Sequence, residues 1–132
     1  MPGYTVTRLE EADDVLGDYP GEMRMMAGPL GSEQVAFTYR RMPQHTGGKG
    51  SYGHSHARQE ELYFVVSGRL QFKLEDEVIE AGRGTAIRVA PEVVRSVWND
   101  EPADAEIVIV STRAKDDDSK PEYKPDFWPE DN

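Results

Sequence analysis

The sequence contains no cysteine, and this absence removes two classes of structure at once. Neither a disulfide framework nor a thiolate metal site can form within such a chain. No apolar run reaches the roughly 18 residues of a membrane-spanning helix, and the segment from Met1 to Arg8 lacks the apolar region of a signal peptide. We therefore expect a cytoplasmic protein with no membrane partner.

Basic residues are also in the minority. The 15 Lys and Arg residues stand against 25 Asp and Glu residues, which gives a formal net charge of −10. A surface of this sign repels phosphate backbones, so we do not expect a nucleic acid as a partner. Hydrophobic residues make up 37% of the 132 positions, which supplies one modest core and indicates a single domain.

Short runs of strand-forming residues alternate with turn residues, and almost no helical period is present. Turn signals that recur about every 8–12 residues favour an all-β sandwich or barrel. Strands are expected over residues 4–9, 34–42, 62–66, 70–74, 85–90, 93–98 and 106–111. The run at 62–66 is apolar on both faces, so its second face would need covering by another sheet or by a partner subunit.

The segment 114–132 differs in composition from the rest of the chain. It is acidic and contains three prolines, which argues against a regular secondary-structure element. It also carries Tyr123, Phe127 and Trp128, although aromatic residues are depleted in disordered tails. We therefore expect it to lie extended on a domain formed by residues 1–113, or on a neighbouring subunit, with Phe127 and Trp128 as anchors.

One stretch concentrates the residues that can carry chemistry. It runs from Gly48 to Gly68 and reads GKGSYGHSHARQEELYFVVSG. His54 and His56 are one residue apart, so on an extended strand both side chains point to the same side. Glu61 begins the next apolar run, and the four intervening residues can bend the chain so that its carboxylate faces the imidazoles. Two imidazoles and one carboxylate form a ligand set for a divalent cation with open coordination positions.

The spacing of these residues resembles the first motif of the cupin superfamily. All five anchors fit: Gly48, five residues, His54, one residue, His56, four residues, Glu61, six residues and Gly68. The resemblance implies a small jelly-roll β-barrel and a divalent metal (Fe, Mn, Zn or Ni) bound by the two His and the Glu. Cupins include dioxygenases, sugar isomerases and decarboxylases, so the resemblance fixes no reaction.

The second cupin motif is matched only in part, over residues 84–99. Gly84 and Asn99 are kept, but Arg95 stands where the family has its last metal-binding histidine. Arg95 cannot ligate a cation, and at about 5 Å it would repel a divalent ion by roughly 7 kcal/mol at an effective dielectric of about 20. Three arrangements stay open: Arg95 turns away from the metal, an anion lies between the two, or Arg95 pairs with Glu61 and no metal is bound.

These residues support two hypotheses of function. In the first, a metalloprotein with dioxygenase- or isomerase-type activity binds a small carboxylate or phosphate through Arg95, with Tyr63 and Asn99 as further ligand contacts. In the second, a non-enzymatic cupin, with or without a metal ion, binds or senses a small molecule. His45 is either a fourth metal ligand or an exposed loop residue. The habit of the family and the two-sided apolar strand at 62–66 predict a homodimer.

Overall fold

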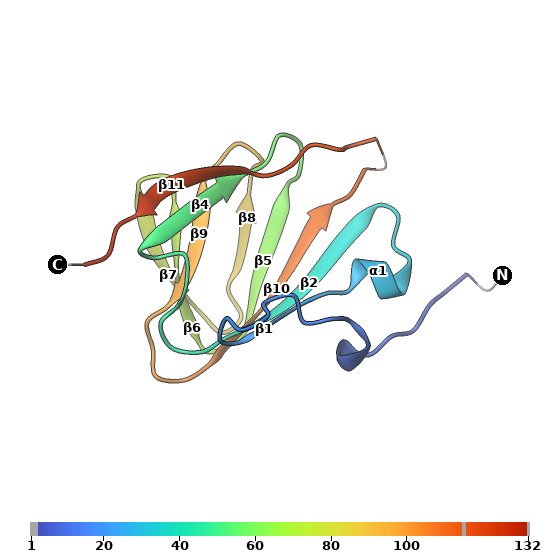
Figure 1. Cartoon of the computed structure of the whole chain (residues 1–132), viewed down its shortest axis with the longest axis horizontal. Helices are drawn as coiled ribbons and strands as arrows, with labels where there is room; N and C mark the ends of the chain where they lie inside the picture. Colours follow the sequence, from blue (N-terminus) through green and yellow to red (C-terminus); the bar gives the residue numbers. More distant parts are fainter. Residues whose placement is uncertain (1–2, 115, 132) are drawn as a thin grey trace.

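A computed structural model describes residues 3–114 and 116–131 and consists almost entirely of β-strands (Figure 1). The helical elements are a 3-10 turn, η1 (Leu9–Glu11), and one short helix, α1 (Ala27–Leu30). The strands are β1 (Glu22–Met25), β2 (Val35–Met42), β3 (Thr46–Gly47), β4 (Ser51–Ser55), β5 (Glu61–Ser67), β6 (Arg69–Leu74), β7 (Glu77–Gly82), β8 (Ala86–Val89), β9 (Arg95–Asn99), β10 (Ala105–Thr112) and β11 (Glu122–Trp128). Within the described ranges, no helix is long and apolar enough to span a bilayer. The expected all-β fold is confirmed.

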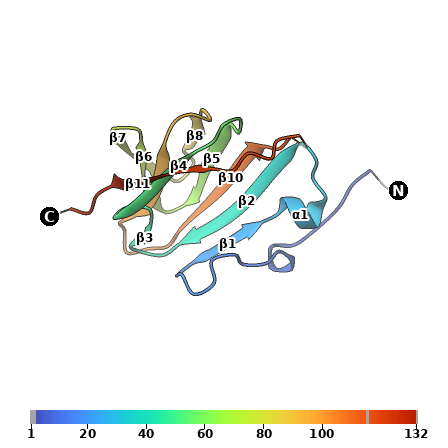
Figure 2. The ribbon, with the colours of Figure 1, turned by 45° about the horizontal axis from the view of Figure 1, so that its top comes forward.

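The strands form two antiparallel sheets. The first sheet has the order β1-β2-β10-β5-β8, and the second has the order β11-β4-β9-β6-β7, with β3 paired to β9. Figure 2 shows β2 and β10 running side by side in the first sheet and β11 lying along β4 in the second. The chain crosses from the second sheet to the first between β4 and β5, so the two histidines and the glutamate come from opposite sheets.

The core lies between the two sheets and follows the period-two pattern of the strands. In β5 the inward residues Tyr63 and Val65 are buried, whereas the outward residues Leu62, Phe64 and Val66 are 47%, 45% and 39% exposed. The core cluster that surrounds Tyr63 and Val65 consists of Met42, Leu70, Phe72, Ala81, Val89, Val97, Ala105 and Ile107. No second sheet covers the outer face of β5 among the described residues.

The turn between β5 and β6 accounts for the last glycine of the first motif. Gly68 has a φ of +80°, a left-handed conformation that residues with a Cβ adopt at a cost in free energy. A Cβ at this position would also lie 2.7 Å from the Cα of Ala105 on β10. The glycine therefore suits the tight turn at which β5 ends and β6 begins.

The strand expected over residues 4–9 is wrong. Tyr4 and Val6 are 75% and 82% exposed, and no neighbouring strand pairs with this segment. A period-two pattern favours a strand only when one face packs against other residues, and without a partner strand this segment has no such face. The edge of the first sheet is formed instead by β1, where Met23 pairs with Arg40 of β2.

The segment after residue 113 contributes a strand that the sequence did not predict. β11 pairs with β4, and the side chains of Phe127 and Trp128 are each only 5% exposed. The pairing register shifts between Lys124 and Trp128, which places Pro125 in an irregular part of an edge strand, where proline is tolerated. Lys115 and Asn132 of the segment lie outside the described residues, and its packing on a neighbouring subunit stays a prediction.

Candidate metal centre

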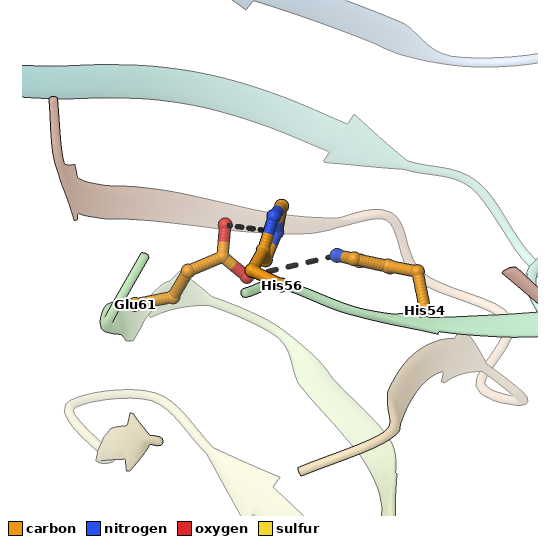
Figure 3. A group of neighbouring side chains, drawn as sticks. All are labelled: His54, His56 and Glu61. Atoms are coloured by element: carbon orange, nitrogen blue, oxygen red, sulfur yellow. Dashed lines mark ion pairs between the residues drawn. The ribbon is translucent and has the colours of Figure 1, made fainter. Parts of the chain in front are cut away.

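Three side chains converge at the point where the chain passes from one sheet to the other (Figure 3). His54 lies on β4, His56 follows one residue after that strand ends, and Glu61 is the first residue of β5. The structure thus brings together the two histidines and the glutamate that the sequence singles out. One ligand atom from each of the three lies within 4.8 Å of the others.

The geometry of this group suits a cation. Nε2 of His54 lies 3.7 Å from Oε1 of Glu61, and Nε2 of His56 lies 3.6 Å from Oε2 of the same carboxylate. Ligand atoms bound at about 2.1 Å lie roughly 3.0–3.4 Å apart, so a small contraction would bring these atoms onto one ion. Nε2 of His56 is buried and has no hydrogen-bond partner, which leaves a lone pair without a recipient. The donor set therefore fits a divalent metal.

The protonation states of the group also suit metal binding. Burial raises the pKa of Glu61. Its contact with His54, the hydrogen bond from Tyr63 and the charge of Arg95 together lower the pKa by more than burial raises it, so the pKa lies below the ordinary 4.5. Burial lowers the pKa of His56 below the ordinary 6.5, despite the opposing effect of Glu61. At neutral pH the carboxylate is ionised and this imidazole is neutral, as metal ligation requires.

Arg95 is 1% exposed and lies next to Glu61 of this group. Its Nε is 3.5 Å from Oε1 of Glu61. Its terminal nitrogens face the backbone, with Nη1 donating weakly to the carbonyls of His54 and Pro91 at 3.4 and 3.5 Å, and Nη2 donating to Ala90 at 3.2 Å. The guanidinium fork therefore lies against the chain, while its charge stays close to the carboxylate.

The structure separates the other two residues that the sequence assigns to ligand contacts. Tyr63 lines the cavity, and its hydroxyl donates a 2.8 Å hydrogen bond to Oε1 of Glu61. Asn99 is completely buried away from the cavity, where its amide nitrogen donates to the carbonyls of Met42 and Ala103, and its oxygen accepts from the Glu101 N–H. Both amide hydrogens of Asn99 are thus used in shaping a loop, and these contacts do not support a ligand role.

His45 lies outside the metal group. Its ring stacks on Trp98 at a centroid distance of 5.9 Å, and its side chain is 63% exposed. Its Nε2 lies 3.8 Å from Asp100. These contacts match the exposed loop residue among the two alternatives.

The three side chains open into a cavity of about 1290 Å³ between the sheets. Its walls include Tyr19, Arg40 and Tyr52, none of which the sequence assigned to the site with a defined role. Arg40 was missed because a charged residue inside a predicted strand is normally expected to face the solvent. The alternation of Thr38, Arg40 and Met42 on one face of β2 was the available signal, since Met42 is completely buried.

Known proteins support the fold independently of this geometry. A cupin protein from Bacteroides fragilis is 18% identical, with 91% of this chain and 92% of that chain covered and a TM-score of 0.67. A putative sugar phosphate isomerase from Acidithiobacillus ferrooxidans is 15% identical, with 70% of this chain and 59% of that chain covered and a TM-score of 0.61. A mutant of Bacillus subtilis oxalate decarboxylase is 20% identical, with 89% of this chain and 32% of that chain covered and a TM-score of 0.69.

This chain therefore spans less than two thirds of the isomerase and about a third of the decarboxylase, and at these identities the likeness concerns the fold alone. No curated protein matches the sequence. The family model described as a cupin domain matches residues 41–111, which is more than half of the chain and includes both histidines, Glu61 and Arg95. The chain belongs to the cupin family.

Proposed function

We propose that this cupin binds a divalent metal ion through His54, His56 and Glu61 and holds a small anionic ligand in the adjoining cavity. One observation carries the proposal: three ligand atoms from the end of β4 and the start of β5 converge within 4.8 Å, and the buried Nε2 of His56 has no hydrogen-bond partner. A buried nitrogen without a partner destabilises the fold unless something binds it. A metal ion removes that penalty.

Two imidazoles and one carboxylate leave coordination positions open toward the cavity. Iron, manganese, zinc and nickel all accept this donor set, and the metal would supply Lewis-acid or oxygen chemistry. A bound carboxylate or phosphate would balance the charge that the metal and Arg95 bring together. Solved structures with this fold include a putative sugar phosphate isomerase and an oxalate decarboxylase, and an isomerase- or dioxygenase-type reaction on a small acid agrees with such a site.

Metal content tests this proposal directly. Elemental analysis of the purified protein after metal loading should find close to one ion per chain. His54→Ala and Glu61→Gln should each lose it, because each removes one of three ligands. His45→Ala is the matched control, since His45 is exposed and contacts Trp98 rather than the site, and it should keep the metal. A metal-free wild type, or full metal in Glu61→Gln, would refute the proposal.

A metal-free small-molecule binder is the second candidate. The 3.5 Å contact between Arg95 and Glu61 favours it, because this ion pair balances the carboxylate without any metal. The two candidates differ in their response to a chelator. Turnover or ligand binding that a chelator abolishes and metal restores supports the metalloprotein, whereas ligand binding that a chelator leaves unchanged supports the binder.

We also expect the protein to be a cytoplasmic homodimer. The outward residues Leu62, Phe64 and Val66 form an exposed apolar strip on β5, and a second copy would remove it from water. Light scattering should report a dimer for the wild type and a monomer for Phe64→Lys. A monomeric wild type at high concentration would refute the expectation.

A further inference from the structure

Arg40 lies inside the barrel without an ionic partner. It belongs to the inner face of β2, where it pairs in register with Met23 on one side and Ile107 on the other. Its Nε is buried and has no hydrogen-bond partner, and its side chain forms no salt bridge with any described residue. Burial lowers its pKa, yet a guanidinium stays charged at neutral pH. The cavity therefore contains a positive charge with which no carboxylate of the described residues forms a salt bridge.

A shortage of acidic groups does not explain why Arg40 has no ionic partner. The neighbouring arginines of the same two strands, Arg24 and Arg41, both pair with Glu22, and Arg41 also pairs with Asp104. The ionisable side chains that act on Arg40 are instead the phenols of Tyr19, Tyr52 and Tyr63. A half-buried cation that shares its cavity with phenols is costly in the free protein, and an anion that enters the cavity would offset that cost.

Arg40 shares its cavity with the metal group but lies far along the sheet from it. Through Ser111 of β10, Glu61 is aligned with Ala36 of β2, so Arg40 lies two strands away and four residues further along. Strand spacings of about 4.8 Å and a rise of about 3.3 Å per residue make this roughly 10 Å across the sheet and roughly 13 Å along it. These are separations between backbones. The side chains of Arg40 and Glu61 both line the cavity and extend across part of this gap, so an elongated molecule such as adipate can contact both groups.

We propose that Arg40 binds the acidic group at one end of an elongated ligand whose other end lies at His54, His56 and Glu61. The ligand class is a small molecule with two polar ends, of which the end at Arg40 is a carboxylate or a phosphate. Arg95 contributes charge near the metal group, but its terminal nitrogens are directed at backbone carbonyls and its Nε lies 3.5 Å from Glu61. Arg40 has a buried Nε without a hydrogen-bond partner and, among the described residues, no such carboxylate beside it. The contact at the far end rests on the proposed metal site, and the contact at Arg40 does not.

The test is calorimetric titration of metal-loaded protein with adipate, which has two carboxylates, and with hexanoate, which has the same chain length and one carboxylate. Wild type should bind adipate more tightly than hexanoate. Arg40→Gln should weaken adipate binding by about 10- to 100-fold, because it removes a charge-assisted hydrogen bond. Arg40→Lys, which keeps the charge without the fork, should lie between the two. Arg41→Gln is the matched control and should bind adipate as wild type does, because Arg41 faces the outside of the same strand.

A second measurement separates ligand binding from a structural role. Since Arg40 has no ionic partner, Arg40→Met should melt at the same temperature as ligand-free wild type or higher. A clear drop in the melting temperature would identify Arg40 as a structural residue and overturn the inference. Adipate binding that is equal in wild type and Arg40→Gln, or no binding of either acid by metal-loaded wild type, would overturn it as well.

A different set of results would show that the proposed metal site fails while the role of Arg40 holds. If wild type takes up no metal, the same titrations on the metal-free protein decide the matter. Hexanoate binding that Arg40→Gln removes and Arg41→Gln does not would then support the role of Arg40 while the proposed metal site fails. Hexanoate binding that is insensitive to both substitutions would overturn the role of Arg40 as well.

Discussion

Nε of Arg95 lies 3.5 Å from Oε1 of Glu61, while both terminal nitrogens of the same guanidinium face backbone carbonyls. Of the three arrangements that the sequence leaves open, the structure combines two: the fork is turned toward the chain, and the charge stays next to the carboxylate. A metal ion bound by Glu61 would therefore compete with Arg95 for the same oxygen. That competition would let a substitution at position 95 change the metal affinity.

Replacing Arg95 should tighten metal binding. Arg95→Gln removes the competing charge, and Arg95→His adds an imidazole next to His54, its register partner on β4. We expect the Kd for Zn²⁺ to fall at least about tenfold in Arg95→Gln, equivalent to roughly 1.4 kcal/mol, and further in Arg95→His. Competition titration with a chromophoric chelator measures both. Weaker binding in Arg95→Gln would mean that Arg95 orients Glu61 for the metal rather than competing with it.

Tyr63 should act on the metal through Glu61. Its hydroxyl donates a 2.8 Å hydrogen bond to Oε1, and such supporting contacts orient a ligating carboxylate and keep it ionised. Tyr63→Phe keeps the buried ring and removes only the hydroxyl, so metal affinity should fall by about 10- to 100-fold. The same chelator competition measures this loss. Tyr39→Phe is the control, because Tyr39 bonds Glu106 outside the cavity, and it should leave metal affinity unchanged.

The part of the site within one continuous stretch could be predicted from the sequence. Spacing alone relates His54, His56 and Glu61, because a strand, a bend and a second strand leave few ways to arrange three anchors. Alternation places Arg40 on the same face of β2 as Met42, but the sequence does not show that this face turns inward or that no described carboxylate pairs with Arg40 there. The sequence offers Asn99 as a ligand contact, but spacing does not show which backbone groups its buried amide meets.

The fold also has parts that the sequence predicts and parts that it does not. Turn residues and period two predicted β2, β5, β6, β8, β9 and β10, whereas no strand was expected at β1, β3 or β7. β11 was missed because the prolines of the segment 114–132 argue against a strand. Its pairing with β4 depends on a tertiary contact, in which the ring of Phe127 packs so closely on Gly53 that a Cβ there would lie 2.4 Å from it. The strand expected over residues 4–9 failed for the opposite reason, since a suitable pattern found no partner strand.

Phe127 should anchor β11 to the barrel. Its ring is buried against Gly53, and Nζ of Lys73 lies 4.1 Å from the ring centroid. Phe127→Ala should lower the free energy of unfolding by about 3–5 kcal/mol, as for other buried aromatic residues, and denaturant unfolding measures it. Tyr123→Ala on the same strand is the control and should cost less than about 1 kcal/mol, since Tyr123 is 61% exposed. Equal losses in the two variants would contradict an anchoring role.

Glu106 should make stability depend on pH on the acid side. Hydrogen bonds from the hydroxyls of Tyr39 and Ser67 lower its pKa below the ordinary 4.5. Because the folded pKa is lower than the unfolded one, the stabilisation is complete above pH 4.5 and is lost as the pH falls through the folded pKa. Glu106→Gln should therefore melt below wild type at pH 7, and the gap should close at lower pH. Glu77→Gln is the exposed control and should show no such closing gap. A gap that stays constant from neutral to acid pH would show that the two hydrogen bonds do not favour the ionised carboxylate.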